Sequence, residues 1–322
     1  MFRPGRLILL AGLVALALAA FAVTAWKAPG PAETPLRIRI EQGATLSGAA
    51  RDLQADGAIR SARTFLLLAR VMGSNAPVLA GEYEVPARAS QSDILRLLQS
   101  GRVLQHLITI PEGMPSILVH ERLMAEEELT GEIPVPEEGS VLPDSYSFET
   151  GESRAAVLGR MQDAMTKALD VAWAARKSTT VVKSKRDALI LASIVEKETG
   201  VPSERRLVAA VYSNRIREGM RLQADPTTIY PITKGKPLGR RIRRSELQAV
   251  NDYNTYAMAG LPRGPIANPG RASIEAVLDP ASGPALYFVA DGKGGHIFAR
   301  TLDEHNANVA RYYALRRARG EM

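Results

Sequence analysis

The chain of 322 residues contains no cysteine. This absence excludes disulfides, zinc fingers and thiol catalysis together. Aromatic residues make up only 5% of the chain, which argues against a stacking surface for single-stranded nucleic acid. The four histidines are scattered and form no visible set of metal ligands. We therefore expect no metal, no cofactor and no nucleic-acid partner.

What is present is typical of a folded protein. Apolar residues make up 46% and charged residues 23%, and the length allows two or three domains. The net charge of +7 is spread along the chain, with local runs such as residues 240–244. A spread basic excess suits an anionic membrane surface or an anionic polymer.

A long uncharged run stands near the N-terminus. Leu7 to Trp26 contains no charge over 20 residues, which is about the length needed to cross a bilayer. Arg3 and Arg6 precede the run, so the positive-inside rule puts the N-terminus in the cytoplasm and the rest of the chain outside. Two A-x-A-like sites leave a cleaved signal peptide as the competing interpretation. The length of the run favours a retained anchor over residues 1–27.

The hydropathy pattern divides the remaining chain into four parts. A linker rich in Pro and Ala, residues 28–35, leads into a small α+β module, residues 36–104. A connecting α+β region follows at 105–184, and a larger α+β domain covers 185–322. In the module we expect two strands and three helices, at 36–40, 81–85, 45–56, 61–70 and about 90–101.

The C-terminal half carries its own pattern. Helical periodicity and capping residues predict four helices, at 186–199, 203–218, 269–278 and 303 to the end. Two strands at 285–290 and 296–300 flank a glycine-rich turn and predict a hairpin. Residues 222–268 are dense in Pro, Gly, Thr and Tyr, so we expect mostly loop there.

Two carboxylates end the helix expected at 186–199, in the stretch LASIVEKETG (191–200). Leu191, Val195 and Glu198 follow the helical spacing i, i+4, i+7, so Glu198 continues an apolar stripe. Glu196 lies about 200° round the helix from that stripe. Burial raises the pKa of a carboxyl, and a carboxyl protonated at neutral pH can serve as a general acid. The alternative is that both glutamates are ordinary solvated acids at a helix end.

Two short stretches of the expected loop are rich in amides, hydroxyls and phenols. They are LQADPTTIY (222–230) and DYNTY (252–256). Side chains of this kind suit saccharides, which need hydrogen bonds and flat faces for stacking. They are equally typical of turns.

Long motifs in this order resemble the endolytic murein transglycosylases of the MltG (YceG-like) family. They are LASIVEKETG, YSNRIREGMRLQADPTTIY, YNTYAMAGLPRGPIANPG and LYFVADGKGGHIFARTLDEHN, preceded by IPEG at 110–113 and LPDSYSF at 142–148. The resemblance implies a single-pass inner-membrane protein whose periplasmic part cuts peptidoglycan glycan strands internally. It implies that the module at 36–104 is LysM-like and that the C-terminal half is catalytic. The family usually has an aromatic residue where Leu142 stands.

The resemblance also implies a chemistry that one carboxyl can perform. The bond cut is the β-1,4 link between N-acetylmuramic acid and N-acetylglucosamine, and the product has a 1,6-anhydro-muramyl end. One Glu protonates the leaving oxygen and then acts as base on the 6-hydroxyl of the same sugar. The apolar stripe favours Glu198, and Glu196 stays a candidate because the motif contains both.

The same comparison gives candidates for contacts and partners. The residues expected to hold the saccharide are Gln223, Asp225, Thr227, Tyr230, Asn254 and Tyr256. The expected partners are glycan strands, the inner membrane and peptidoglycan synthases of the elongation or division machinery. A membrane-anchored scaffold that binds peptidoglycan without cutting it is the alternative function.

Overall fold

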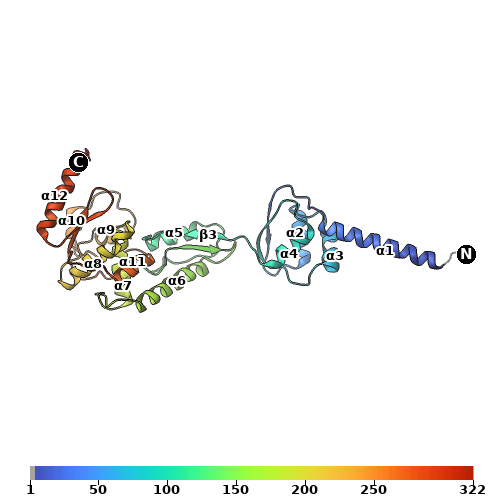
Figure 1. The fold of residues 1–322 in the computed structure, drawn as a ribbon, viewed down its shortest axis with the longest axis horizontal. Coiled ribbons are helices and arrows are strands. Elements are labelled where there is room, and N and C mark those ends of the chain that lie inside the picture. Colours follow the sequence, from blue (N-terminus) through green and yellow to red (C-terminus); the bar gives the residue numbers. More distant parts are fainter. Residues whose placement is uncertain (1–3, 322) are drawn as a thin grey trace. The chain divides into compact units, whose positions relative to one another are not determined.

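The computed structural model describes residues 4–321, which fall into two compact units (Figure 1). Unit 1 comprises the chain up to residue 106 together with 147–150, and unit 2 comprises 107–146 and the chain from 151 onward. Helices and short strands occur in both units, and each sheet has two strands. Arg3, on which the predicted orientation partly rests, lies outside the described residues.

Unit 1 begins with one long apolar helix, α1 (Pro4–Lys27). Residues 9–27 of this helix are long and apolar enough to cross a membrane. Its last turn differs from the rest, because Trp26 is buried and its ring lies 6.0 Å from that of Phe65. The Gln91 side chain also donates a hydrogen bond to the carbonyl of Ala25. The end of α1 is therefore part of the core of unit 1.

The rest of unit 1 is a two-stranded sheet covered by helices. The order is β1 (Leu36–Ile40), α2 (Leu46–Ala55), α3 (Ala62–Met72), β2 (Gly81–Val85) and α4 (Gln91–Ser100). The strands are antiparallel with Leu36 opposite Val85, and alternate residues face the core. Each helix starts at a Ser or Thr whose side chain accepts from the first turn, which is why the capping residues predicted these helices.

The segment expected to be a linker is attached to unit 1. The Gly30 N–H donates to the carbonyl of Arg88 at 3.1 Å, and the Arg88 N–H donates to the carbonyl of Ala32 at 2.7 Å. A Cβ at Gly30 would lie 2.4 Å from the carbonyl oxygen of Ala89, so only glycine allows this approach.

Next along the chain come two short strands, each divided between the two units, and two helices of unit 2. They are β3 (His106–Thr109), α5 (Ser116–Ala125), β4 (Ser145–Phe148) and the long α6 (Arg154–Ala174). β3 and β4 form a two-stranded sheet. Polar Ser and Tyr residues in β4 conceal its strand character in the sequence.

The core of unit 2 is built around α7 (Lys185–Glu198). It packs against α6, α8 (Arg205–Arg217) and α11 (Arg271–Leu278), which gather in the same part of Figure 1. Seven of its residues are buried, namely Ala188 and residues 190–195. Five of them belong to this core, namely Ala188, Leu191, Ala192, Ile194 and Val195. A helix that is apolar all round is a central helix, which matches the run of apolar residues in the sequence.

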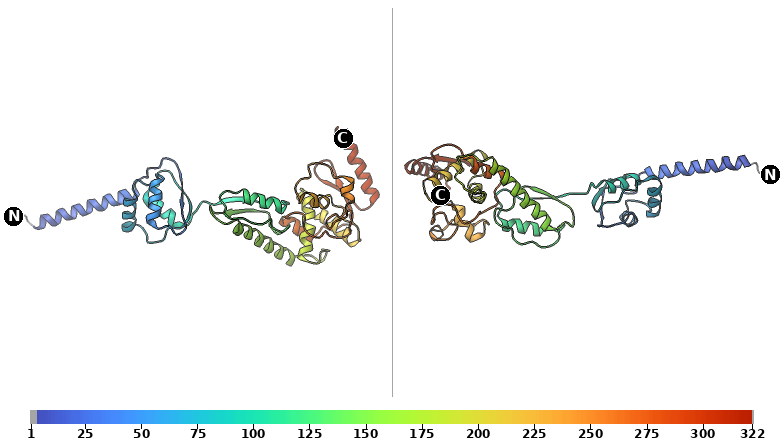
Figure 2. Two further views of the ribbon diagram at one scale, coloured as in Figure 1. Left: turned by 180° about the vertical axis from the view of Figure 1, so that it is seen from behind. Right: turned by 90° about the horizontal axis from the view of Figure 1, so that it is seen from below.

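A hairpin and a last helix complete unit 2. β5 (Tyr287–Ala290) pairs antiparallel with β6 (His296–Ala299). The C-terminal helix α12 (Leu302–Ala318), red in Figures 1 and 2, packs against both strands. The hairpin predicted from the glycine-rich turn is confirmed.

The region expected to be mostly loop contains two helices. They are α9 (Asp225–Thr233) and α10 (Arg244–Gln248). Pro226 stands in the first turn of α9, where its missing N–H costs nothing. The rest of this region is loop, as expected.

Candidate active site

The last turn of α7 carries both glutamates of the motif. Ser184 caps the start of the helix by accepting from the N–H of Asp187. The helix ends at Glu198, because Thr199 is extended and Pro202 follows soon after. Glu196 and Glu198 leave this turn in different directions and meet different surroundings.

Glu198 lies in the wall of a pocket of about 300 Å³, here called the acid pocket. Polar groups dominate its lining, which comes from α7, α8, the start of α9, β5 and α12. The lining residues are Glu198, Tyr212, Arg215, Leu222, Gln223, Asp225, Tyr256, Phe288 and His305.

The surroundings of Glu198 keep its carboxyl protonated close to neutral pH. Burial raises the pKa of Glu198 to about 7, and the negative charge of Asp225 adds to the rise. A hydrogen bond from the Tyr212 hydroxyl and the charge of Arg215 oppose it. The group is therefore able both to donate and to accept a proton at neutral pH.

Three residues predicted to hold saccharide share this pocket with Glu198. They are Gln223, Asp225 and Tyr256. The Tyr256 hydroxyl donates to Oδ1 of Asp225 at 2.6 Å, which fixes the carboxylate at the first turn of α9. Gln223 has a φ of 54°, an uncommon conformation for a residue with a side chain. Its side chain is exposed next to the carboxyl.

Two further residues of the acid pocket were not among the predicted candidates. Arg215 is buried, and its guanidinium donates to the carbonyls of Leu286 and Leu222 at 2.7 Å each. Tyr212 is buried one turn earlier on α8. Val208, Tyr212 and Arg215 follow the same i, i+4, i+7 spacing that selected Glu198, so an arginine on an apolar stripe was the available signal.

Glu196 has a structural environment. Its side chain is only 5% exposed, and Oε2 accepts from the N–H of Gly270 at 2.9 Å, at the start of α11. Oε1 lies 3.6 Å from a guanidinium nitrogen of Arg205, which also pairs with Glu112 at 2.8 Å. These contacts attach the end of α7 to the start of α11 and to Arg205.

Three predicted saccharide contacts lie elsewhere. Thr227 and Asn254 have no exposed surface. The Thr227 hydroxyl donates to the carbonyl of Ala224 at 2.6 Å, and the Asn254 amide donates to the carbonyl of Ala249 at 2.7 Å. These two side chains hold the loops in shape and do not reach a ligand, so the predicted contact is corrected for both.

The third of these residues, Tyr230, lines a different pocket. It is nearly buried, its ring lies 4.8 Å from that of Tyr253, and its hydroxyl bonds to the buried carboxyl of Glu138. Tyr230 therefore does not share the acid pocket with Gln223, Asp225 and Tyr256.

The end of α7 is tied to the hairpin through Glu204. Oε2 of Glu204 accepts from the Thr199 hydroxyl at 3.2 Å and lies 2.7 Å from Nδ1 of His296. Oε1 accepts from the His296 N–H at 2.7 Å. Because Phe288 of the same hairpin lines the acid pocket, these bonds fix one wall of the pocket against the residue after Glu198.

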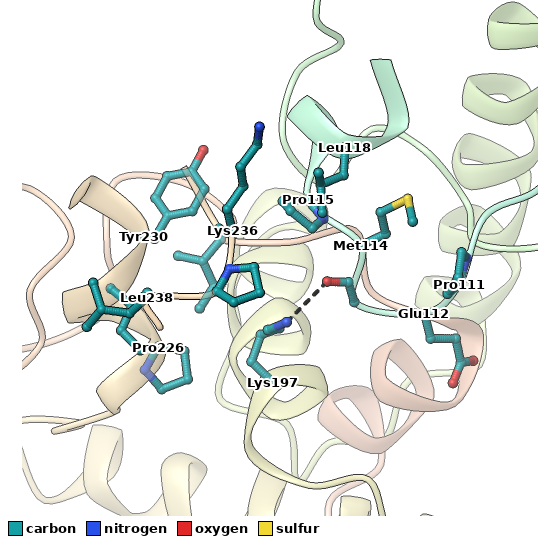
Figure 3. Close-up of a pocket in the computed structure, with 15 residues that line it drawn as sticks. Pro111, Glu112, Met114, Pro115, Leu118, Lys197, Pro226, Tyr230, Lys236 and Leu238 are labelled. Atoms are coloured by element: carbon teal, nitrogen blue, oxygen red, sulfur yellow. Dashed lines mark hydrogen bonds between the residues drawn. The ribbon is translucent and has the colours of Figure 1, made fainter. Parts of the chain in front are cut away.

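A second pocket, of about 470 Å³, lies beside the end of α7 (Figure 3). We call it the proline pocket because Pro111, Pro115, Pro226 and Pro237 line it. Lys197 lies at its base, where Nζ donates to the carbonyl of Gly113 at 3.4 Å.

Comparisons with known proteins identify relatives of this chain. The model of the YceG-like family matches residues 38–311. An endolytic murein transglycosylase of Bacillus subtilis is 27% identical over 312 residues, which cover 87% of this chain and 85% of that protein. An endolytic murein transglycosylase of Streptococcus pneumoniae is 26% identical, and the match covers 85% of this chain and 58% of that longer protein.

A solved structure gives the same answer for the fold. The crystal structure of a yceG-like protein from Listeria monocytogenes superimposes with a TM-score of 0.52 at 26% identity, covering 85% of this chain and 98% of that one. The family match extends over most of unit 1 and nearly all of unit 2, and it includes every residue of the acid pocket. The chain therefore belongs to the YceG-like family.

Proposed function

We propose that this chain is a lytic transglycosylase that cuts peptidoglycan glycan strands internally, with Glu198 as its acid and its base. The observation that carries the proposal is a single carboxyl whose pKa burial raises to about 7, in the wall of a polar pocket. The relatives named endolytic murein transglycosylases support it.

The first step uses Glu198 as an acid. Its proton passes to the glycosidic oxygen between the muramyl and glucosaminyl sugars, and the bond from that oxygen to the muramyl anomeric carbon breaks. The N-acetyl group of the muramyl sugar can stabilise the cation that forms. A carboxyl with a pKa near 7 is protonated in a useful fraction at neutral pH and is acidic enough to give up the proton.

The second step uses the same group as a base. The Glu198 carboxylate takes the proton of the muramyl 6-hydroxyl, whose oxygen then bonds to the anomeric carbon. The product is a 1,6-anhydro end, and the carboxyl is protonated again. No water enters the reaction, so a pocket wall that excludes water from the carboxyl favours this outcome over hydrolysis.

Other residues of the acid pocket hold the sugar and the carboxyl. Gln223, Asp225 and Tyr256 offer an amide, a carboxylate and a phenol on the open side of the pocket. Arg215 and Tyr212 lie behind Glu198 and set its charge and direction. Glu196 keeps α7 attached to α11 and takes no part in proton transfer.

The location follows from the apolar helix and the substrate. We place α1 across the inner membrane with its N-terminus in the cytoplasm, so that both units face the periplasm where peptidoglycan lies. Two antiparallel strands enclosing two helices, β1-α2-α3-β2, support a LysM-like role for unit 1. Peptidoglycan synthases belong to the same proposal as partners, since they make the strands that this enzyme would cut.

Mass spectrometry of digested glycan strands tests the proposal. The full chain in detergent is the right reagent, because Trp26 belongs to the core of unit 1 and a fragment starting at residue 28 would lose it. Wild type, Glu198→Gln and Glu196→Gln are compared. We expect anhydro-ended fragments from wild type and from Glu196→Gln, and none from Glu198→Gln.

The other outcomes separate the alternatives. Reducing ends in place of anhydro ends would mean that water attacks, for which the Asp225 carboxylate in the same pocket is the candidate base. Strands that bind wild type without being cut would favour the non-catalytic scaffold. Loss of cleavage only in Glu196→Gln would transfer the proton-donating role to that residue.

A further inference from the structure

The proline pocket adjoins the acid pocket through two pairs of consecutive residues. Glu198 lines the acid pocket and Lys197 the proline pocket. In the same way, Asp225 faces the acid pocket and Pro226 the proline pocket. The end of α7 and the first turn of α9 are therefore the wall between the two, and a ligand held at Glu198 has the proline pocket beside it.

The walls of the proline pocket are apolar. Met114, Pro115 and Leu118 lie on one side, and Pro226, Tyr230 and Leu238 lie on the other, with Lys197 between them (Figure 3). Apolar walls of this kind favour small aliphatic groups such as methyls, because burying such groups removes them from water.

Positive charge is available inside and beside this pocket. Among the described residues Lys197 has no ion-pair partner, and an ammonium has three donors of which the Gly113 carbonyl takes one. Lys236 lies across the pocket from Lys197 and pairs with Glu121 at 2.6 Å (Figure 3). Glu112 is paired with Arg205, and Glu138, whose pKa burial raises, is close enough to Lys197 for their charges to interact.

The chain leaving the pocket is also basic. Lys236, Pro237 and Leu238 form its edge and continue into the arginine-rich segment 240–244, in which Arg240 pairs with Glu246. A ligand extending outward from Lys197 thus meets prolines and the cations Lys236 and Arg240, each of which also pairs with a glutamate. The complementary ligand has methyl side chains and free carboxylates.

Peptidoglycan carries such a group at the position required. The lactyl substituent of the muramyl sugar bears a short peptide stem that contains alanine methyls and free carboxylates. The muramyl sugar is the one whose anomeric carbon reacts at Glu198, so its stem must leave from beside the acid pocket.

We propose that the proline pocket binds the peptide stem of the muramyl sugar at the scissile bond, with Lys197 pairing to a stem carboxylate. This inference rests on the proposed function, and it makes the chain selective for strands that still carry their stems. A stem held here would also fix which glycosidic bond lies against Glu198.

Two substrates and three variants test the stem pocket. The substrates are glycan strands with their stems and the same strands after an amidase has removed them. Lys197→Met removes the charge at the base of the pocket, and Leu238→Glu adds a repelling charge on the far wall. Lys167→Met, an exposed lysine on α6 outside the pocket, is the matched control.

We expect wild type and Lys167→Met to cut stem-bearing strands about tenfold faster than stem-free strands, as the loss of one charge-assisted hydrogen bond implies. Lys197→Met and Leu238→Glu should lose that difference by slowing only the stem-bearing reaction. Equal wild-type rates on both substrates would overturn the proposal. Variants that slow both reactions by the same factor would overturn it as well.

A binding measurement tests the stem pocket separately from the proposed function. Full-length Glu198→Gln is titrated calorimetrically with a stem-bearing and a stem-free tetrasaccharide. If wild type cuts neither strand, the proposed function fails, and the titration alone decides the pocket. About tenfold tighter binding of the stem-bearing sugar, lost in Glu198→Gln/Lys197→Met, supports the stem pocket, and equal affinities refute it.

Discussion

Glu196 and Glu198 stand two residues apart on one helix, and their surroundings could hardly differ more. Glu196 accepts a hydrogen bond from the N–H of Gly270 and lies 3.6 Å from the guanidinium of Arg205. Glu198 meets a phenol, a nearby carboxylate and an arginine already bonded to carbonyls, and burial raises its pKa to about 7. A carboxyl whose oxygens are held by an N–H and an arginine suits a structural role. A buried carboxyl with a raised pKa suits proton transfer.

The largest expected effect comes from removing the group with the raised pKa. Glu198→Gln should lower the cleavage rate by about 10³-fold, since a general acid and base is lost. The rate of anhydro-end formation measures this. A loss below tenfold would contradict the assignment of proton transfer to Glu198, because another group would then have to supply the proton.

The same variant should be more stable than wild type at high pH. Folding raises the pKa of Glu198 from 4.5 to about 7, so the unfolded chain ionises more easily. The penalty is absent below pH 4.5, grows between pH 4.5 and 7, and is complete above 7. Glu198→Gln removes a cost of up to about 3 kcal/mol at pH 8 and leaves stability at pH 4 unchanged.

Trp173 fluorescence during urea unfolding measures this difference. In a Trp26→Phe background, Trp173 on α6 is the one remaining tryptophan and reports on unit 2. Equal stabilisation of Glu198→Gln at pH 4 and pH 8 would contradict the linkage.

The opposite pattern is expected for Glu196. Glu196→Ala leaves the Gly270 N–H and the Arg205 guanidinium without this partner, which should destabilise unit 2 by about 2–3 kcal/mol. Activity well below the unfolding transition should stay within about threefold of wild type. The Trp173 assay measures the stability. Glu275→Ala, at an exposed position of α11, is the control and should change it by less than about 0.5 kcal/mol.

The pH profile sharpens the comparison without disturbing Glu198 itself. Cleavage begins with protonated Glu198, so kcat/KM should fall as pH rises above about 7. Asp225→Asn removes the nearby negative charge that helps to raise this pKa, and the midpoint should move to lower pH. The position of the midpoint is the readout, because Asp225 also faces the substrate. A midpoint that stays in place would mean that another group titrates.

The smallest expected effect concerns the phenol that fixes Asp225. Tyr256→Phe removes the 2.6 Å hydrogen bond to Oδ1 of Asp225. We expect kcat/KM to fall about tenfold with little change in unfolding, since a hydrogen bond to a charged group is lost at the pocket surface. Tyr313→Phe, on the exposed side of α12, is the matched control. Equal activity of Tyr256→Phe and Tyr313→Phe would show that the Tyr256 hydroxyl does not contribute to cleavage.

Local patterns carried much of this fold and part of this site. The buried stripe of α7, its Ser184 cap and the glycine-rich turn of the hairpin are visible in the sequence because they depend on neighbours within a few residues. The position of Glu198 beyond Leu191 and Val195 follows from the same periodicity. This periodicity predicts that the Glu198 carboxyl is removed from water, and burial is the main cause of its raised pKa.

Contacts between distant segments could not be predicted. Thr227 in α9 and Thr255 in the stretch 252–256 are hydrogen-bonded at 2.8 Å, and nothing within either segment indicates that both hydroxyls are buried. Asn254 looked like a surface amide because its bonding partners are backbone carbonyls, which every sequence has. The burial of Arg215 is hard to predict for a related reason. Arginine is normally a surface residue, and only the helical spacing from Val208 and Tyr212 indicates that Arg215 faces the core.

The attachment of α1 to unit 1 has a mechanical consequence. Trp26 is buried in the core of unit 1, and two hydrogen bonds join Arg88 to Gly30 and Ala32 just after α1. No flexible joint is therefore left between α1 and the rest of unit 1. A rigid connection transmits torque, so tilting or spinning of α1 in a bilayer would turn unit 1 by the same angle. Unit 1 would therefore keep a fixed distance from the part of α1 that is long and apolar enough to cross a membrane.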